Sequence, residues 1–133
     1  MGKRQFQVLT MTSIRNELKL EKVIEIANEL AEYFVYHCGE GDHYVSLIDK
    51  LRESNTRSTL ISSIYVLLRY GHIHLEQSME KMNRRKMESL FHFIKIAKNE
   101  EVCRFHSSLI TFISAFELEK IRNHERYLLE LLS

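Results

Sequence analysis

Proline is absent from the chain, and only four glycines and no tryptophan occur in its 133 residues. Average usage would give about 5% proline, which is the residue that interrupts α-helices most strongly. Few positions therefore impose a break on regular structure. We expect long helices whose ends are marked in part by glycine, because glycine readily takes the positive φ found at helix termini.

Cysteine is scarce, and no long apolar run is present. The two cysteines, Cys38 and Cys103, match no paired motif for zinc or redox chemistry. No segment approaches the ~20 apolar residues of a membrane span, and the basic start MGKRQFQVLTMTS lacks the apolar stretch of a signal peptide. We predict reduced thiols, no membrane association, a cytoplasmic location and a flexible N-terminal segment over residues 1–12.

The spacing of the apolar residues predicts an all-α fold. Three-four spacing places them on helical stripes within 20–38, 44–51, 60–68, 75–82, 87–97 and 102–132. Asp42 and Thr56 are candidate N-caps, whereas Gly39, Gly41 and Gly71 are candidate helix ends. The length suits one domain over residues 1–133. We predict a single-domain bundle of five to six helices, with a turn near 83–86 and either one helix or two across 100–132.

Charge is nearly balanced overall but unevenly distributed along the chain. Residues 25–54 hold seven acidic against two basic side chains, whereas residues 57–106 hold nine basic against five acidic ones. If these segments form neighbouring surfaces, the molecule has two faces of opposite sign. Such faces suit head-to-tail association or a charged protein partner.

The densest group of potential metal ligands is found in the stretch YHCGEGDHY, residues 36–44. A tight turn would bring His37, Glu40, Asp42 and His43 toward one point, and structural zinc takes four ligands of these kinds. The spacing matches no motif of defined geometry, and Asp42 is already expected to cap a helix. We interpret the stretch as a turn between helices and predict no cofactor, with His37, Asp42 and His43 as the residues to examine for a metal.

A possible catalytic pair occurs in RYGHIH, where Arg69 and His74 stand in an R-x4-H arrangement. This spacing resembles the active motif of HEPN-family ribonucleases, all-helical domains that cut RNA in a dimer cleft. The resemblance implies that Arg69 stabilises developing phosphate charge while His74 moves a proton. Tyr70 departs from the small polar residue usual in that family, and Gly71 is expected to end the helix between the pair.

Basic residues gather in the segment 81–98. They are Lys81, Arg84, Arg85, Lys86, Lys95 and Lys98. A cluster of this kind can bind phosphates without reading bases. The stretches LTMTSIR and VCRFHSSLITFISAF are similar to the small helical subunit of type III CRISPR effector complexes, which implies a place along guide or target RNA. An RNA-associated subunit of a ribonucleoprotein complex is therefore an alternative function, and a HEPN-like ribonuclease is a third.

Three methionines, Met79, Met82 and Met87, cluster where a helix is expected to change direction. Methionine suits adaptable contact surfaces because its side chain is flexible and polarisable, although it also fills gaps in cores. No catalytic constellation or glycine-rich phosphate loop stands out. Our leading hypothesis is a non-enzymatic helical interaction protein, such as a small adaptor, inhibitor or assembly subunit. Its partner would be another protein or a second copy of the chain.

Overall fold

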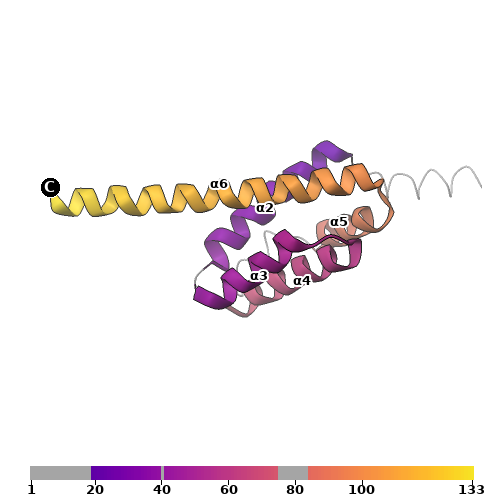
Figure 1. Cartoon of the computed structure of the whole chain (residues 1–133), viewed down its shortest axis with the longest axis horizontal. Helices are drawn as coiled ribbons and strands as arrows, with labels where there is room; N and C mark the ends of the chain where they lie inside the picture. Colours follow the sequence, from indigo (N-terminus) through magenta and orange to yellow (C-terminus); the bar gives the residue numbers. More distant parts are fainter. Residues whose placement is uncertain (1–18, 40, 75–83) are drawn as a thin grey trace, which may run out of the picture.

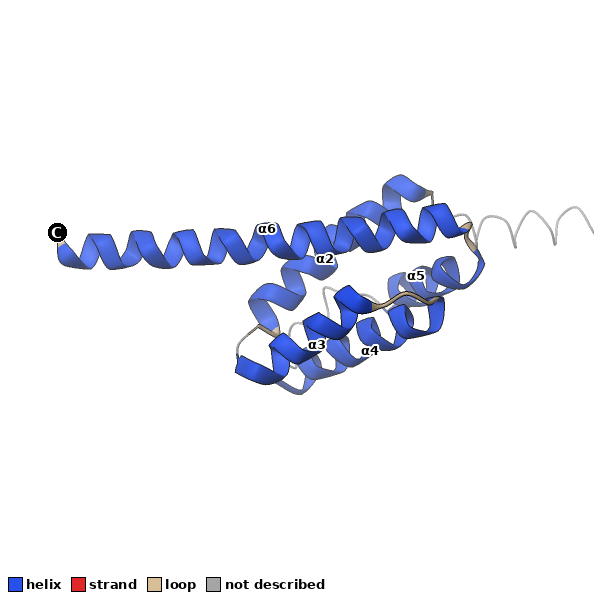
Figure 2. Cartoon of the chain, in the orientation of Figure 1, coloured by secondary structure: helices blue, strands red, loops and turns tan. Residues whose placement is uncertain are grey.

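A computed structural model describes residues 19–39, 41–74 and 84–133 of the protein. These residues form five helices and no strands (Figure 2). The helices are α2 Leu20–His37, α3 Gly41–Glu53, α4 Arg57–His74, α5 Arg84–Ile96 and α6 Asn99–Leu132. The prediction of an all-α bundle is confirmed. The expected flexible segment 1–12 and the apolar stripe expected within 75–82 lie outside the described residues.

The core forms chiefly where α2 crosses the first half of α6 (Figure 1). Val23, Ala27, Leu30 and Phe34 follow the three-four spacing of one α2 stripe, and all four are fully buried. Phe105 is buried to the same degree within the first half of α6. Helices α3, α4 and α5 lie below the crossing of α2 and α6 in the view of Figure 1 and complete the bundle.

Helix α4 begins with a reciprocal cap, as expected from Thr56. The backbone N–H of Thr59 donates to Thr56 Oγ1 at 3.1 Å, and the N–H of Thr56 donates to Thr59 Oγ1 at the same distance. This arrangement resembles a capping box with threonine in place of the usual glutamate, so two backbone donors at the helix start are satisfied.

Basic side chains from distant parts of the chain bind the carbonyl groups at three helix C-termini. Arg57 Nη1 donates to Ile94 O and Lys95 O of α5, each at 3.0 Å. Lys120 Nζ reaches Val35 O at 3.3 Å and Gly39 O at 3.0 Å, at the end of α2. In the same way, His106 Nε2 lies 2.8 Å from Leu51 O of α3. These contacts satisfy carbonyls that have no partner within their own helix.

Two boundary predictions were wrong. Helix α3 begins at Gly41, which has φ 90°, so Asp42 lies in the first turn instead of at the N-cap. Helix α4 continues through Gly71 to His74. A Cβ at Gly71 would lie 2.6 Å from Cys38 Sγ and still closer to Tyr33 Oη. Glycine at this position therefore permits close approach of α4 to α2 and does not mark a helix end.

Helix α6 settles the question of one helix or two. It runs without interruption for 34 residues, and its second half extends well beyond the other helices (Figure 1). The predicted turn near 83–86 falls at the start of α5, whose first residue is Arg84. None of the described helices is long and apolar enough to cross a membrane.

The two cysteines are both free and differ in exposure. Cys38 is buried, and its Sγ donates to Leu67 O at 3.4 Å, whereas Cys103 is exposed on α6. Burial raises the pKa of the Cys38 thiol to about 12. Since the thiolate is the reactive form, folding should protect Cys38 from thiol reagents.

We expect an aromatic disulfide reagent to titrate one thiol, Cys103, in the folded protein at pH 8 and both thiols after denaturation. Absorbance counting will measure this directly. A Cys103→Ser variant should then react at least about 100-fold more slowly when folded than when unfolded. Rapid modification of this folded variant would contradict the buried position of Cys38.

Candidate functional site

Among the described residues, the structure does not gather His37, Asp42 and His43 into a metal site, and Glu40 lies outside the described residues. His37 packs against the Tyr33 ring at a centroid distance of 5.4 Å, whereas the His43 ring lies 5.0 Å from that of Tyr70. Asp42 is exposed in the first turn of α3. No group of three or more histidine, cysteine or carboxylate side chains among the described residues could hold an ion.

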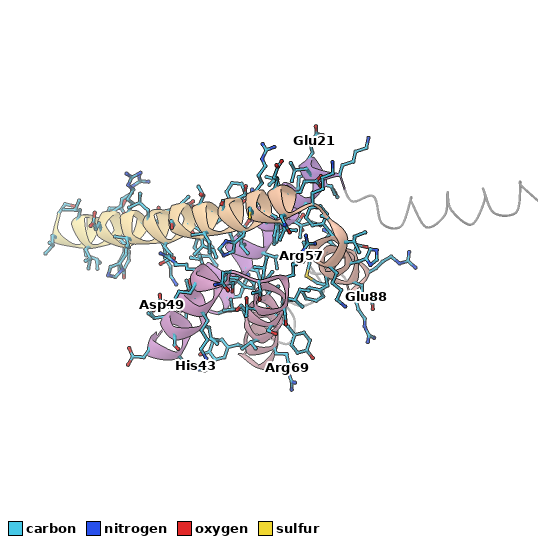
Figure 3. All side chains as sticks on the ribbon, turned by 45° about the vertical axis from the view of Figure 1, so that its right-hand side comes forward. Glu21, His43, Asp49, Arg57, Arg69 and Glu88 are labelled. Atoms are coloured by element: carbon cyan, nitrogen blue, oxygen red, sulfur yellow. The ribbon has the colours of Figure 1, made fainter. Side chains whose placement is uncertain are left out.

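Arg69 and His74 both belong to α4, on one unbroken helix. Five positions along an α-helix correspond to a rotation of about 140°, so the two positions lie on different faces. Arg69 is exposed and points away from the bundle (Figure 3). Within a single copy, the backbone therefore does not bring this pair to one point.

The basic residues of α5 are partly engaged by acidic side chains. Lys86 Nζ lies 2.9 Å from Glu29 Oε2 of α2, and Arg84 Nε lies 3.7 Å from Glu88 Oε1. Lys95 and Lys98 are exposed, whereas Lys81 lies outside the described residues. Lys86 is therefore paired with an acidic side chain of α2, whereas Arg84, Lys95 and Lys98 remain exposed.

The methionine hypothesis is corrected for Met87. Its side chain is 7% exposed and belongs to the core, so it is not available as a contact surface. Met79 and Met82 lie outside the described residues. The preference of methionine for burial explains the position of Met87.

A different surface is apparent on the second half of α6, which projects from the bundle (Figure 1). Seven large apolar side chains in residues 118–132 remain between 44% and 85% exposed. We call them the α6 stripe: Leu118, Ile121, Tyr127, Leu128, Leu129, Leu131 and Leu132. Leu118, Ile121, Leu128 and Leu132 follow helical three-four spacing with one gap, at Glu125, so they share one face.

A groove adjoins the base of the α6 stripe, where α6 leaves the bundle. It encloses about 570 Å³ between α6 and the connection of α2 to α3. Its lining residues are Val35, Gly39 and Tyr44 on one side and Glu117, Lys120, Ile121, His124 and Glu125 on the other. The groove and the stripe share Ile121 and so form one continuous surface.

Tyr44 adds an unusual polar group beside this groove. Its side chain is 7% exposed, and its hydroxyl has no hydrogen-bond partner among the described residues. Burial, followed by the nearby charge of Glu117, raises the pKa of Tyr44, so the phenol remains neutral at physiological pH. Lys120 is held in place through the carbonyls at the end of α2. The groove therefore combines an apolar wall with a positioned cation and a neutral phenol.

The sequence indicates the α6 stripe in part, because Ile121, Leu128, Leu131 and Leu132 belong to the apolar pattern within 102–132. The pattern alone indicated core. The pattern does not show how far α6 extends beyond α2. Because α6 extends beyond α2, its second half is left uncovered.

Comparison with known proteins identifies no relative: no protein-family model, curated protein or solved structure matches the chain.

Proposed function

We propose that this protein is a non-enzymatic helical interaction protein, acting as an adaptor, inhibitor or assembly subunit. It binds a protein partner through the α6 stripe and the adjoining groove. The observation that supports this proposal is the exposure of seven large apolar side chains on a helix that projects from its own core. Contiguous apolar patches of this size are uncommon on monomers and are typical of interaction sites.

The distribution of charge favours a protein over RNA as the partner. Two of the basic residues expected to bind phosphates already contact Glu29 and Glu88. The α6 stripe presents leucine side chains, whose removal from water lowers the free energy. These side chains form no ionic contact with a phosphate backbone. We further propose a cytoplasmic location, which suits a protein with the free thiols of Cys38 and Cys103.

Replacing both Ile121 and Leu128 with lysine should remove partner binding without unfolding the bundle. Both side chains are substantially exposed, at 56% and 44%, so the free energy of unfolding should change by less than about 1 kcal/mol. The tagged protein is to be purified from cells that make it natively, at about 0.1 M and about 0.5 M salt, with identification of bound protein and nucleic acid. We expect the protein partner to persist at high salt and to be lost with the double variant.

The matched control is Glu130→Lys, which adds the same positive charge. Nine helical positions separate Glu130 from Ile121, which places it on the opposite face of α6. This control should retain the partner. Recovery of nucleic acid at low salt only, or of the same proteins with the Ile121→Lys, Leu128→Lys variant, would overturn the proposed function.

A further inference from the structure

We propose that the partner bound by the α6 stripe is a second copy of this chain, in a two-fold symmetric dimer whose projecting α6 halves pair antiparallel. This inference rests on the proposed function and specifies its partner. It is supported by the length of the exposed stripe, by the pattern of charges along it and by the position of the groove.

The exposed face is long enough for a contact between two copies. Leu118, Ile121, Leu128, Leu129 and Leu132 lie within about 100° of one another around α6 and extend over about 21 Å of its length, whereas Tyr127 lies on the opposite side of the helix. The antiparallel arrangement places the two bundles at opposite ends of the paired helices, because the hydrogen bonds between α6 and the rest of the described bundle extend no further along α6 than Lys120. The bundles therefore do not compete for the same space.

The charges on the stripe face are self-complementary in one antiparallel register. Glu125 occupies the gap within the α6 stripe and Arg122 lies at its edge, and no ion pair joins either to another described residue. When Arg122 of one copy faces Glu125 of the second, symmetry forms the pair twice. In this register Leu118 faces the second copy's Leu129, and Ile121 and Leu128 of both copies meet around the two-fold axis.

The same register accounts for the groove. It places the second copy's Leu131 beside Glu117 and its Leu128 between Glu117 and Ile121, on the side of α6 that faces Tyr44. Leucine side chains would fill the apolar space there and cover the buried phenol. Each copy thus supplies both a groove and the side chains that occupy the other groove. Because each copy buries the same surface in this contact, none of that surface is left to bind a third chain. The assembly therefore closes as a dimer and does not extend into a filament.

Charge reversal tests this register directly. The full chain should dimerise reversibly in sedimentation equilibrium between about 1 and about 200 µM. Arg122→Glu or Glu125→Arg alone should raise the dimer dissociation constant at least about tenfold, because each places like charges together twice. The double variant Arg122→Glu, Glu125→Arg should restore it to within about threefold of the unmodified chain.

Mixing the two single variants provides a second test. Arg122→Glu and Glu125→Arg should form a heterodimer with each other more strongly than either forms a homodimer, since opposite charges then meet at both positions. Arg104→Glu, at an exposed position of α6 that lies 18 residues before Arg122 and outside the paired segment, makes the same change of charge and is the matched control, which should leave dimerisation unchanged.

Three outcomes decide between the inference and the function on which it rests. A chain that is monomeric throughout the concentration range overturns the dimer. If the purification from cells still yields a different protein that is lost with Ile121→Lys and Leu128→Lys, the proposed function stands without the dimer. A dimer that is insensitive to charge reversal and to mixing overturns the antiparallel register.

Discussion

Replacing Phe105 with alanine is expected to lower the free energy of unfolding by about 3–5 kcal/mol, the largest effect of any single substitution considered. Phe105 lies in the half of α6 that packs on α2, and none of its side chain is exposed. Removing the ring takes away apolar contacts and leaves a cavity that the neighbouring helices can close only in part. Because a small domain is stable by only about 5–15 kcal/mol, this change would consume much of its stability.

Urea denaturation followed by circular dichroism measures this prediction, with Phe112→Ala as the matched control. Phe112 is in the same helix and has the same side chain, but it is only partly buried. We expect its replacement to cost about half as much or less, with similar m-values for both variants. Equal losses would show that the burial of Phe105 does not determine its contribution.

The second large effect is expected at Gly71, where leucine should destabilise the fold by about 3 kcal/mol. The first added carbon would lie 2.6 Å from Cys38 Sγ, and both Cys38 and Tyr33 are buried in the contact between α2 and α4. Neither side chain can move to solvent, so the two helices must separate. Ser62→Leu is the matched control, because Ser62 is an exposed position of the same helix, and it should change stability by less than about 1 kcal/mol.

Alanine at Gly71 tests the sign of the effect. Replacing an ordinary glycine inside a helix with alanine stabilises by about 0.5–1 kcal/mol, because the unfolded chain loses freedom. At Gly71 the steric conflict should outweigh this gain and destabilise by about 1 kcal/mol or more. Adding Cys38→Ala removes one conflicting atom, so the double variant should be less destabilised than the sum of its parts. A stabilised Gly71→Ala protein would refute the close approach of α4 to α2.

The sequence predicted a helix well wherever the spacing of neighbouring apolar residues was sufficient to define it. The apolar stripe of residues 20–38 corresponds to α2, and Thr56 caps α4 through its neighbour Thr59. Both features depend on residues within a few positions of one another, and short-range spacing encodes them directly. The candidate site was different: Met87 is part of the core, and the groove beside Tyr44 combines three segments that are distant in the sequence.

By itself the sequence determined that the described chain is helical and which faces of its helices are apolar, because periodicity and the absence of proline act locally. Only the tertiary structure decided which apolar faces are covered. Arg57, His106 and Lys120 bind the ends of helices far away in sequence, Gly71 allows α2 and α4 to touch, and the second half of α6 extends beyond its neighbours. The physical reason is that an apolar stripe requires only that some surface is buried against it. The lengths of the other helices, and the positions at which they cross, determine whether this chain supplies that surface.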